Sequence, residues 1–78
     1  MKILIGRSNS ELGHKIADRM NEKPVERLIS NFADGEIRVQ IEDNIRGKDL
    51  FIVQSLQPPA DNILELLLLI DAARRASA

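Results

Sequence analysis

The sequence contains no cysteine, no tryptophan and no tyrosine. Without cysteine the chain can form neither a disulfide bond nor a thiolate metal site, which fits a protein of a reducing compartment. Its longest apolar run, Leu66 to Ile70, is far shorter than the ~18 residues of a membrane-spanning helix. The segment from Met1 to Ile5 is too short for a signal peptide. We therefore expect a soluble cytoplasmic protein with no membrane partner.

Positive and negative charges are nearly balanced. The chain has 11 Lys and Arg residues against 12 Asp and Glu residues, which gives a formal net charge of -1. This balance provides no general attraction to nucleic acid, so we expect no nucleic-acid partner. With 78 residues, of which 44% are hydrophobic and 29% are charged, the chain has the composition of one small globular domain.

The pattern of apolar residues predicts the elements of an α/β domain. In chain order they are a strand at Lys2 to Ile5, an amphipathic helix with an apolar stripe of Leu12, Ile16 and Met20 that is closed by Pro24, strands at Val25 to Ser30, Ile37 to Ile41 and Leu50 to Val53, and a helix from about Ile63 to Arg75. Alternation of apolar and polar residues from Ile37 to Ile41 predicts a half-exposed antiparallel strand. The continuous apolar run from Leu50 to Val53 predicts a strand buried on both faces.

The predicted order of elements is β-α-β-β-β-α. It indicates an α/β sheet that is mostly parallel, with one antiparallel hairpin strand. The last helix is strongly apolar, and its segment stops at Ala76-Ser77-Ala78 with no strand after it. In a parallel sheet such a helix leads back into another strand, so we expect the chain to be a partial domain.

Two features near the N-terminus have ordinary structural explanations. The turn Gly6-Arg7-Ser8-Asn9-Ser10 joins a strand to a helix, where free backbone N–H groups can bind an anion. It lacks the glycine spacing of the common phosphate-binding loops, so we interpret it as a capping turn. His14 lies off the apolar stripe and is the only histidine, so we expect a solvated side chain and no metal site.

The Asp34-Gly35 turn between two extended segments is flanked by Phe32 and Glu36. A phenylalanine at a hairpin tip either folds back onto its own sheet or covers a ligand. A flat ring beside a carboxylate suits a purine, because the ring stacks on the base and the carboxylate accepts a hydrogen bond from an exocyclic amine. The residues alone leave both interpretations open.

Several blocks of the sequence resemble one enzyme family. The segments NFADGEIRVQIEDNIRGKDLFIVQS and DNILELLLLIDAARRASA are similar to the N-terminal quarter of ribose-phosphate pyrophosphokinase, also called phosphoribosyl pyrophosphate synthetase. The likeness runs from Lys2 to Ala78, with the separate blocks in the same order. It implies that residues 1–78 are the N-terminal part of the first phosphoribosyltransferase-like domain of that enzyme, with no second domain present.

The resemblance implies an activity and its ligands. Members of the family transfer the diphosphoryl group of ATP to the anomeric hydroxyl of ribose 5-phosphate, giving phosphoribosyl diphosphate and AMP, and they require Mg²⁺. Such chemistry depends mainly on positioning and on neutralisation of charge by cations. The enzymes assemble into dimers and hexamers with an ATP site shared between subunits, which implies a homo-oligomer. By resemblance, Phe32, Asp34 and Glu36 hold the adenine of ATP in the neighbouring subunit's site.

A second group of residues matches effector-binding positions of the family. From spacing alone, Arg46 in the basic turn Arg46-Gly47-Lys48 fits phosphate binding and simple solvation equally well. In the regulated members of the family, the positions matched by Asn44 and Arg46 help to bind the phosphates of an allosteric effector. Ser77 matches another contact in the same region.

Other parts of the family's active site have no counterpart in this sequence. The metal-binding histidine and aspartate, the flexible catalytic loop and the loop for ribose 5-phosphate are not matched by any segment of the chain. We therefore expect no catalytic and no metal-binding residue here, no complete site for ATP or Mg²⁺, and no activity from the chain by itself. The alternative interpretation is a non-catalytic, self-associating α/β module, or a fold-evolution fragment derived from that family.

Overall fold

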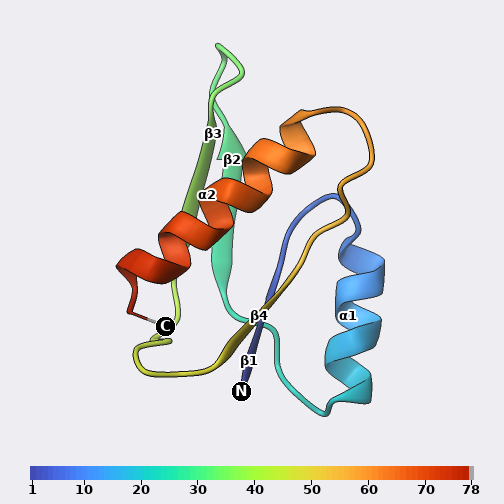
Figure 1. Ribbon diagram of the computed structural model, residues 1–78, viewed down its shortest axis with the longest axis vertical. Coiled ribbons are helices and arrows are strands. Elements are labelled where there is room, and N and C mark those ends of the chain that lie inside the picture. Colours follow the sequence, from blue (N-terminus) through green and yellow to red (C-terminus); the bar gives the residue numbers. More distant parts are fainter. Residues whose placement is uncertain (78) are drawn as a thin grey trace.

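A computed structural model describes residues 1–77 and contains four strands and two helices (Figure 1). In chain order they are β1 (Lys2–Ile5), α1 (Ser10–Arg19), β2 (Arg27–Asn31), β3 (Ile37–Ile41), β4 (Leu50–Val53) and α2 (Asp61–Arg75). The α/β class and the predicted order β-α-β-β-β-α are confirmed. Ala78, the last residue of the predicted domain, lies outside the described residues.

The strands form two separate two-stranded ladders. β1 and β4 are parallel, with Lys2 opposite Leu50, whereas β2 and β3 are antiparallel, with Asn31 opposite Ile37. The two ladders meet where the backbone N–H of Val25 donates to the carbonyl oxygen of Ile3 at 2.8 Å. The predicted parallel and antiparallel parts of the sheet are therefore both present. β1 lies between β4 and the segment at Val25 that leads into β2.

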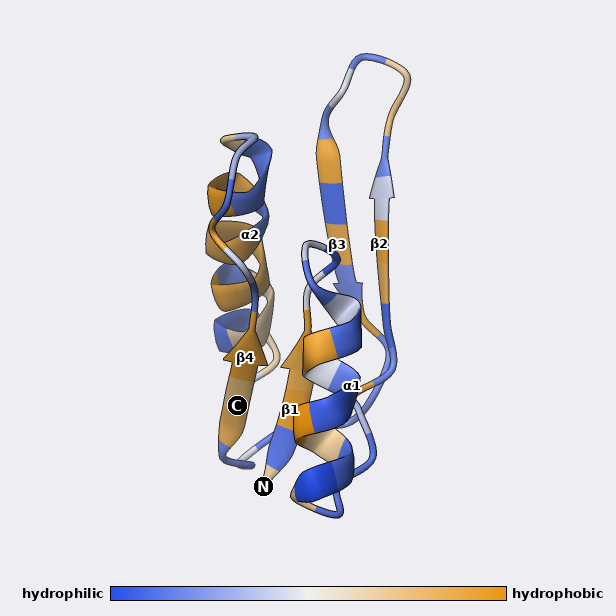
Figure 2. Ribbon diagram, turned by 90° about the vertical axis from the view of Figure 1, so that its right-hand side faces the viewer, coloured by the Kyte–Doolittle hydropathy of each residue, from blue (hydrophilic) through white to orange (hydrophobic). Residues whose placement is uncertain are grey.

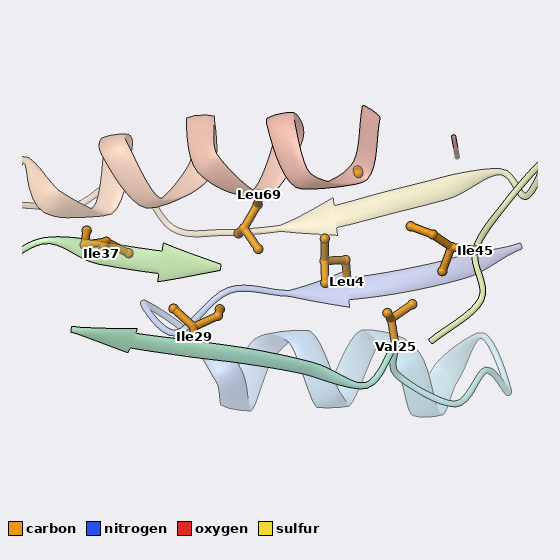
Figure 3. Packing of buried hydrophobic residues seen from close by; sticks show 7 residues of the cluster. Leu4, Val25, Ile29, Ile37, Ile45 and Leu69 are labelled. Atoms are coloured by element: carbon orange, nitrogen blue, oxygen red, sulfur yellow. The ribbon is translucent and has the colours of Figure 1, made fainter. Parts of the chain in front are cut away.

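β1 also separates two apolar clusters, because successive side chains of a strand point to opposite faces. One cluster contains the buried side chains of Leu4, Val25, Ile29, Ile37, Ile45, Leu69 and Ala73. Figure 3 shows Leu69 extending from α2 toward the strands that carry Leu4 and Ile37. The other cluster contains Ile3, Ile5 and Ala17 and holds α1 against β1. The first cluster therefore joins α2 to both ladders.

The predicted apolar stripe of α1 is wrong for two of its three members. Leu12 and Met20 are 45% and 39% exposed, and the helix buries Gly13 and Ala17 instead. A methyl group at Gly13 would collide with the side chain of Ile5, so the helix approaches β1 as closely as small residues allow. Burial on this helix follows residue size rather than the spacing of the large apolar residues.

The expectation that β4 is buried on both faces is also wrong within residues 1–77. Phe51 is 54% exposed, because α1 packs on β1 and leaves this part of β4 uncovered. α2 is less covered than its apolar run suggests: Leu69 is buried, but Leu67 is 57% exposed. Figure 2 shows hydrophobic residues on the side of α2 that is turned away from β3. Neither of these two helices is long and apolar enough to cross a membrane.

Candidate functional site

The tip of the β2–β3 hairpin brings together the three residues assigned to adenine. The N–H of Phe32 donates to the carbonyl oxygen of Glu36 at 2.8 Å, and the N–H of Gly35 donates to the carbonyl oxygen of Phe32 at 2.9 Å. Gly35 has a φ of 88°, which glycine adopts without steric cost. The Asp34 Oδ1 atom accepts a hydrogen bond from the N–H of Glu36 at 3.0 Å. One Asp34 oxygen thus shapes the turn, while the Glu36 carboxylate stays exposed beside it.

The Phe32 ring does not fold fully onto its own sheet. The residue is 46% exposed, and its neighbours through Glu36 are exposed as well. Figure 1 shows the tip projecting beyond the N-terminal end of α2. The ring and the two carboxylates therefore stand where another molecule could contact them, and their role in binding adenine stays a prediction.

The residues assigned to an effector lie around a different turn. The N–H of Gly47 donates to the carbonyl oxygen of Ser77 at 2.7 Å, and Asn44 Oδ1 accepts from the N–H of Arg46 at 3.2 Å. Ile45 is 1% exposed and anchors this turn in the core. The fold thus brings Ser77, at the end of α2, to the turn that carries Asn44 and Arg46.

The effector group and the hairpin tip are far apart. Figure 1 shows the turn between β3 and β4 at the opposite end of the molecule from the tip. Near this turn, Lys48 and Arg74 line one shallow hollow together with Asp49. Two cationic side chains from separate segments therefore lie close to the effector group, which the sequence pattern did not predict.

A polar network at the ends of β1 and β4 was missed by the sequence interpretation. Its centre is Glu65 of α2, which is 3% exposed. Its carboxylate accepts from the backbone N–H of Arg7 at 2.7 Å, from Arg7 Nε at 2.8 Å and from Gln54 Nε2 at 3.1 Å. The position of Glu65 between Leu64 and the apolar run Leu66 to Ile70 is the one signal that could have indicated a buried carboxylate.

The turn Gly6 to Ser10 does more than cap α1. Asn9 is the capping residue, since its Oδ1 atom accepts from the N–H of Leu12 at 3.1 Å. Ser8 instead links the two parallel strands: its Oγ donates to Gln54 Oε1 and accepts from the N–H of Ser55, both at 2.7 Å. These polar groups satisfy one another, and within residues 1–77 no buried side-chain nitrogen or oxygen lacks a partner. The network therefore links β1, β4 and α2, and Arg7, Ser8 and Glu65 of the network also line a surface hollow.

The described part of the chain contains no cluster of three or more His, Cys, Asp or Glu residues that could hold a metal ion. His14 is exposed as expected, and its Nδ1 atom lies 2.7 Å from the carbonyl oxygen of Ser10.

Comparisons with known proteins agree on one family. A family model described as the N-terminal domain of ribose phosphate pyrophosphokinase matches residues 1–78. The ribose-phosphate pyrophosphokinase of Chlorobaculum tepidum is 53% identical over 78 residues, which are 100% of this chain and 24% of that protein. The protein of the same name from Vibrio vulnificus is 48% identical over 79 residues, covering 100% of this chain and 25% of its own length.

A solved structure has the same fold. The crystal structure of phosphoribosylpyrophosphate synthetase from Mycobacterium smegmatis matches with a TM-score of 0.92 and 33% identity, over 99% of this chain and 26% of that one. The chain therefore spans about a quarter of the length of the relatives that it matches.

Proposed function

The chain belongs to the family of the N-terminal domain of ribose phosphate pyrophosphokinase, and we propose that it is part of an enzyme that transfers the diphosphoryl group of ATP to ribose 5-phosphate. The products are phosphoribosyl diphosphate and AMP. The observation that carries this proposal is the match over residues 1–78, supported by 53% identity with the Chlorobaculum tepidum protein. Since the chain spans about a quarter of its relatives, the activity belongs to the whole enzyme.

The hairpin tip supplies one wall of the adenine site. The half-exposed ring of Phe32 stacks on the base, and such stacking contributes about 1–3 kcal/mol per base. The carboxylate of Glu36 and the second oxygen of Asp34 accept hydrogen bonds from the exocyclic amine. This arrangement is supported by the tip geometry, in which Asp34 Oδ1 accepts from the backbone N–H of Glu36 and so holds the Asp34 side chain against the turn that also carries Phe32 and Glu36.

The remaining walls of the adenine site come from another subunit of a homo-oligomer. A projecting tip whose residues 32–36 are all exposed can touch a base from one side only. The tip therefore reaches into a site whose other walls are formed elsewhere. The exposure of the tip alone fits walls from the rest of the enzyme or from a second copy; the resemblance to the family, whose ATP site is shared between subunits, favours the second copy.

The turn that carries Asn44 and Arg46 binds the phosphates of an effector together with Ser77. Support comes from the 2.7 Å hydrogen bond between Gly47 and Ser77, which holds the two segments together. Arg46 is exposed and therefore free to pair with an anion.

Magnesium neutralises the charge of the transferred phosphates in the reaction of this family. Residues 1–77 contain no cluster of three or more His, Cys, Asp or Glu residues, and no step that involves the metal is assigned to them. ATP and Mg²⁺ are accordingly cofactors of the whole enzyme, and we expect this chain to hold neither of them completely.

A second candidate function is a non-catalytic, self-associating module derived from the same family. The observation that favours it is exposed apolar residues at two places, Ile63, Leu64, Leu67 and Ile70 on α2 and Phe51 on the face of β4 away from α2. Exposed apolar surface of this kind is typical of an interface between proteins.

A hybrid enzyme separates the two candidates. Residues 1–78 replace the matching N-terminal segment of the Chlorobaculum tepidum protein, and AMP formation from ATP is measured with and without ribose 5-phosphate. We expect the hybrid to form AMP only when ribose 5-phosphate is present, and the isolated chain to form none. A well-folded hybrid without this activity would contradict the enzymatic proposal, and activity from the isolated chain would contradict the assignment to the whole enzyme.

A further inference from the structure

The two sides of the hairpin tip are anchored differently. Asn31 and Ile37 are the last paired residues of β2 and β3 before the tip. Ile37 is 7% exposed and belongs to the larger apolar cluster, so burial holds the β3 side. Asn31 is exposed and has no such anchor in the core. Beyond this pairing with Ile37, the position of the β2 side of the tip therefore depends on what holds the side chain of Asn31.

Arg7 holds Asn31 from outside the hairpin. Its Nη1 atom donates to Asn31 Oδ1 at 2.6 Å, although 24 positions separate the two residues in sequence. The same guanidinium donates from Nε to Glu65 Oε1 at 2.8 Å. Because a guanidinium is planar and its N–H groups point in fixed directions, one side chain adds a directional link between the β2 side of the hairpin and α2.

The far end of this bridge is buried and hydrogen-bonded to several groups. Glu65 is 3% exposed and accepts two further hydrogen bonds, from the backbone N–H of Arg7 and from Gln54 Nε2. Gly6 leaves no room for even a methyl group beside the side chain of Gln54. The backbone N–H and Nε of Arg7 are thus both hydrogen-bonded to Glu65. These two bonds place Nη1 where it donates to Asn31 of the hairpin.

We propose that Arg7 is a positioning residue for the hairpin tip and sets the direction in which Phe32, Asp34 and Glu36 are presented. The inference rests on the proposed role of the tip in binding adenine. A small rotation at Asn31 moves the ring of the next residue, and stacking on a base requires a defined ring plane. Arg7 acts through Asn31 and does not itself touch ATP.

Amide hydrogen exchange of the 78-residue chain tests the anchoring directly. In Arg7→Met and Asn31→Leu, we expect the amides of Phe32 and Gly35 to exchange about three- to tenfold faster, as expected for the loss of one hydrogen bond. Asn31→Asp keeps an acceptor for Arg7 and should exchange like the wild type. Arg19→Met, which removes an exposed arginine from the last turn of α1, is the matched control.

The amide of Glu42 reports on the fold as a whole. It donates to the carbonyl oxygen of Glu26 at 2.8 Å, at the other end of the same hairpin, and should be unaffected. If Arg7→Met also accelerates exchange of the Glu42 amide, that variant has lost structure generally. Asn31→Leu then provides the test of the anchoring, because it leaves the pair of Arg7 with Glu65 in place. Unchanged exchange of Phe32 and Gly35 in Asn31→Leu would overturn the proposal.

The hybrid enzyme tests the consequence for catalysis. We expect Arg7→Met and Asn31→Leu each to raise KM for ATP about three- to tenfold while kcat and KM for ribose 5-phosphate change little. The double variant should be no worse than the more affected single variant, because both changes remove the same bond. Asn31→Asp should keep the wild-type KM, which a merely structural loss of a side chain would not explain.

The outcomes for Phe32 separate this inference from the proposed function. If Phe32→Ala raises KM for ATP but Arg7→Met and Asn31→Leu do not, the positioning role is overturned and the adenine site stands. If Phe32→Ala leaves KM unchanged, the proposed adenine site fails, and with it the catalytic consequence assigned to Arg7. An increase in KM in all three variants, with Asn31→Asp unaffected, is the result that the proposal requires.

Discussion

The buried carboxylate of Glu65 accepts a hydrogen bond from Arg7 Nε at 2.8 Å, and this pair joins two segments that are 58 positions apart in the sequence. Glu65 is almost fully buried, whereas the side chain of Arg7 is 37% exposed. The pair is therefore neither an ordinary surface ion pair nor a fully buried one. It connects the turn after β1 to the first half of α2.

Replacement of Glu65 should destabilise the fold. We expect Glu65→Leu to lower the free energy of unfolding by about 1–3 kcal/mol, because the N–H of Arg7 loses its acceptor and Gln54 Nε2 loses one of its two acceptors. The partial exposure of Arg7 limits the loss, since its guanidinium can be rehydrated. Urea unfolding followed by circular dichroism measures the change. Glu11→Leu, at an exposed ion pair with Lys15, is the control and should change stability by at most about 0.5 kcal/mol; equal losses in both variants would contradict the account.

Gly13→Ala should destabilise the chain although alanine favours helices. Alanine exceeds glycine in helix propensity by about 1 kcal/mol, but the added methyl group collides with the buried side chain of Ile5. Overpacking of this kind costs about 1–3 kcal/mol, so the net change should be a loss of stability. His14→Ala, on the exposed side of the same helix, should be neutral or slightly stabilising. A gain in stability for Gly13→Ala would show that α1 does not lie so close to β1.

The exposed apolar surface of α2 should support self-association of the chain. Leu67 is 57% exposed, and a lysine in its place puts a charge into any interface formed there. We expect the wild-type chain to show a mass that rises with concentration in sedimentation equilibrium, and Leu67→Lys to shift it toward the monomer. Leu28→Lys, at a residue of β2 that is 51% exposed, is the control. A monomeric wild type at all concentrations would exclude the self-associating module.

Arg46 should contribute to the binding of phosphate. In a titration of the chain with inorganic phosphate, we expect NMR shifts at the amides of Arg46, Gly47 and Ser77, which the 2.7 Å hydrogen bond brings together. Arg46→Ala should weaken this response about threefold or more, because a charge-assisted hydrogen bond is lost. Arg19→Ala should leave it unchanged. Equal effects of the two substitutions would indicate general electrostatic attraction and no site.

The hairpin was predictable because its signals are local. Alternation of polar and apolar residues from Ile37 to Ile41 fixes the exposed face of β3, and the Asp34-Gly35 pair supplies both the positive φ and the side-chain acceptor of the turn. The start of β2 was less well predicted. The strand begins at Arg27 and not at Val25, since Val25 is used to join the hairpin to β1.

The parts that were not predictable depend on contacts between distant segments. The pair of Arg7 with Glu65 is visible only once α2 lies beside the end of β1, and a periodicity argument ranks Leu12 above Gly13 although the close approach to Ile5 buries the glycine. The apolar run of α2 predicts a helix that is buried on all sides. Leu67 is nevertheless 57% exposed, because no other segment of residues 1–77 covers that side of the helix.

The most direct test of the account is KM for ATP in the hybrid enzyme that carries Phe32→Ala. Loss of a stacked ring costs about 1–3 kcal/mol, so we expect KM to rise about tenfold or more while KM for ribose 5-phosphate stays constant. Phe32→Tyr keeps the ring and should restore the wild-type value, and Leu28→Ala on the same hairpin should have no effect. In the isolated chain, Phe32→Ala should leave the free energy of unfolding within about 0.5 kcal/mol of the wild type. An unchanged KM for ATP in the Phe32→Ala hybrid would contradict the central claim that this tip binds adenine.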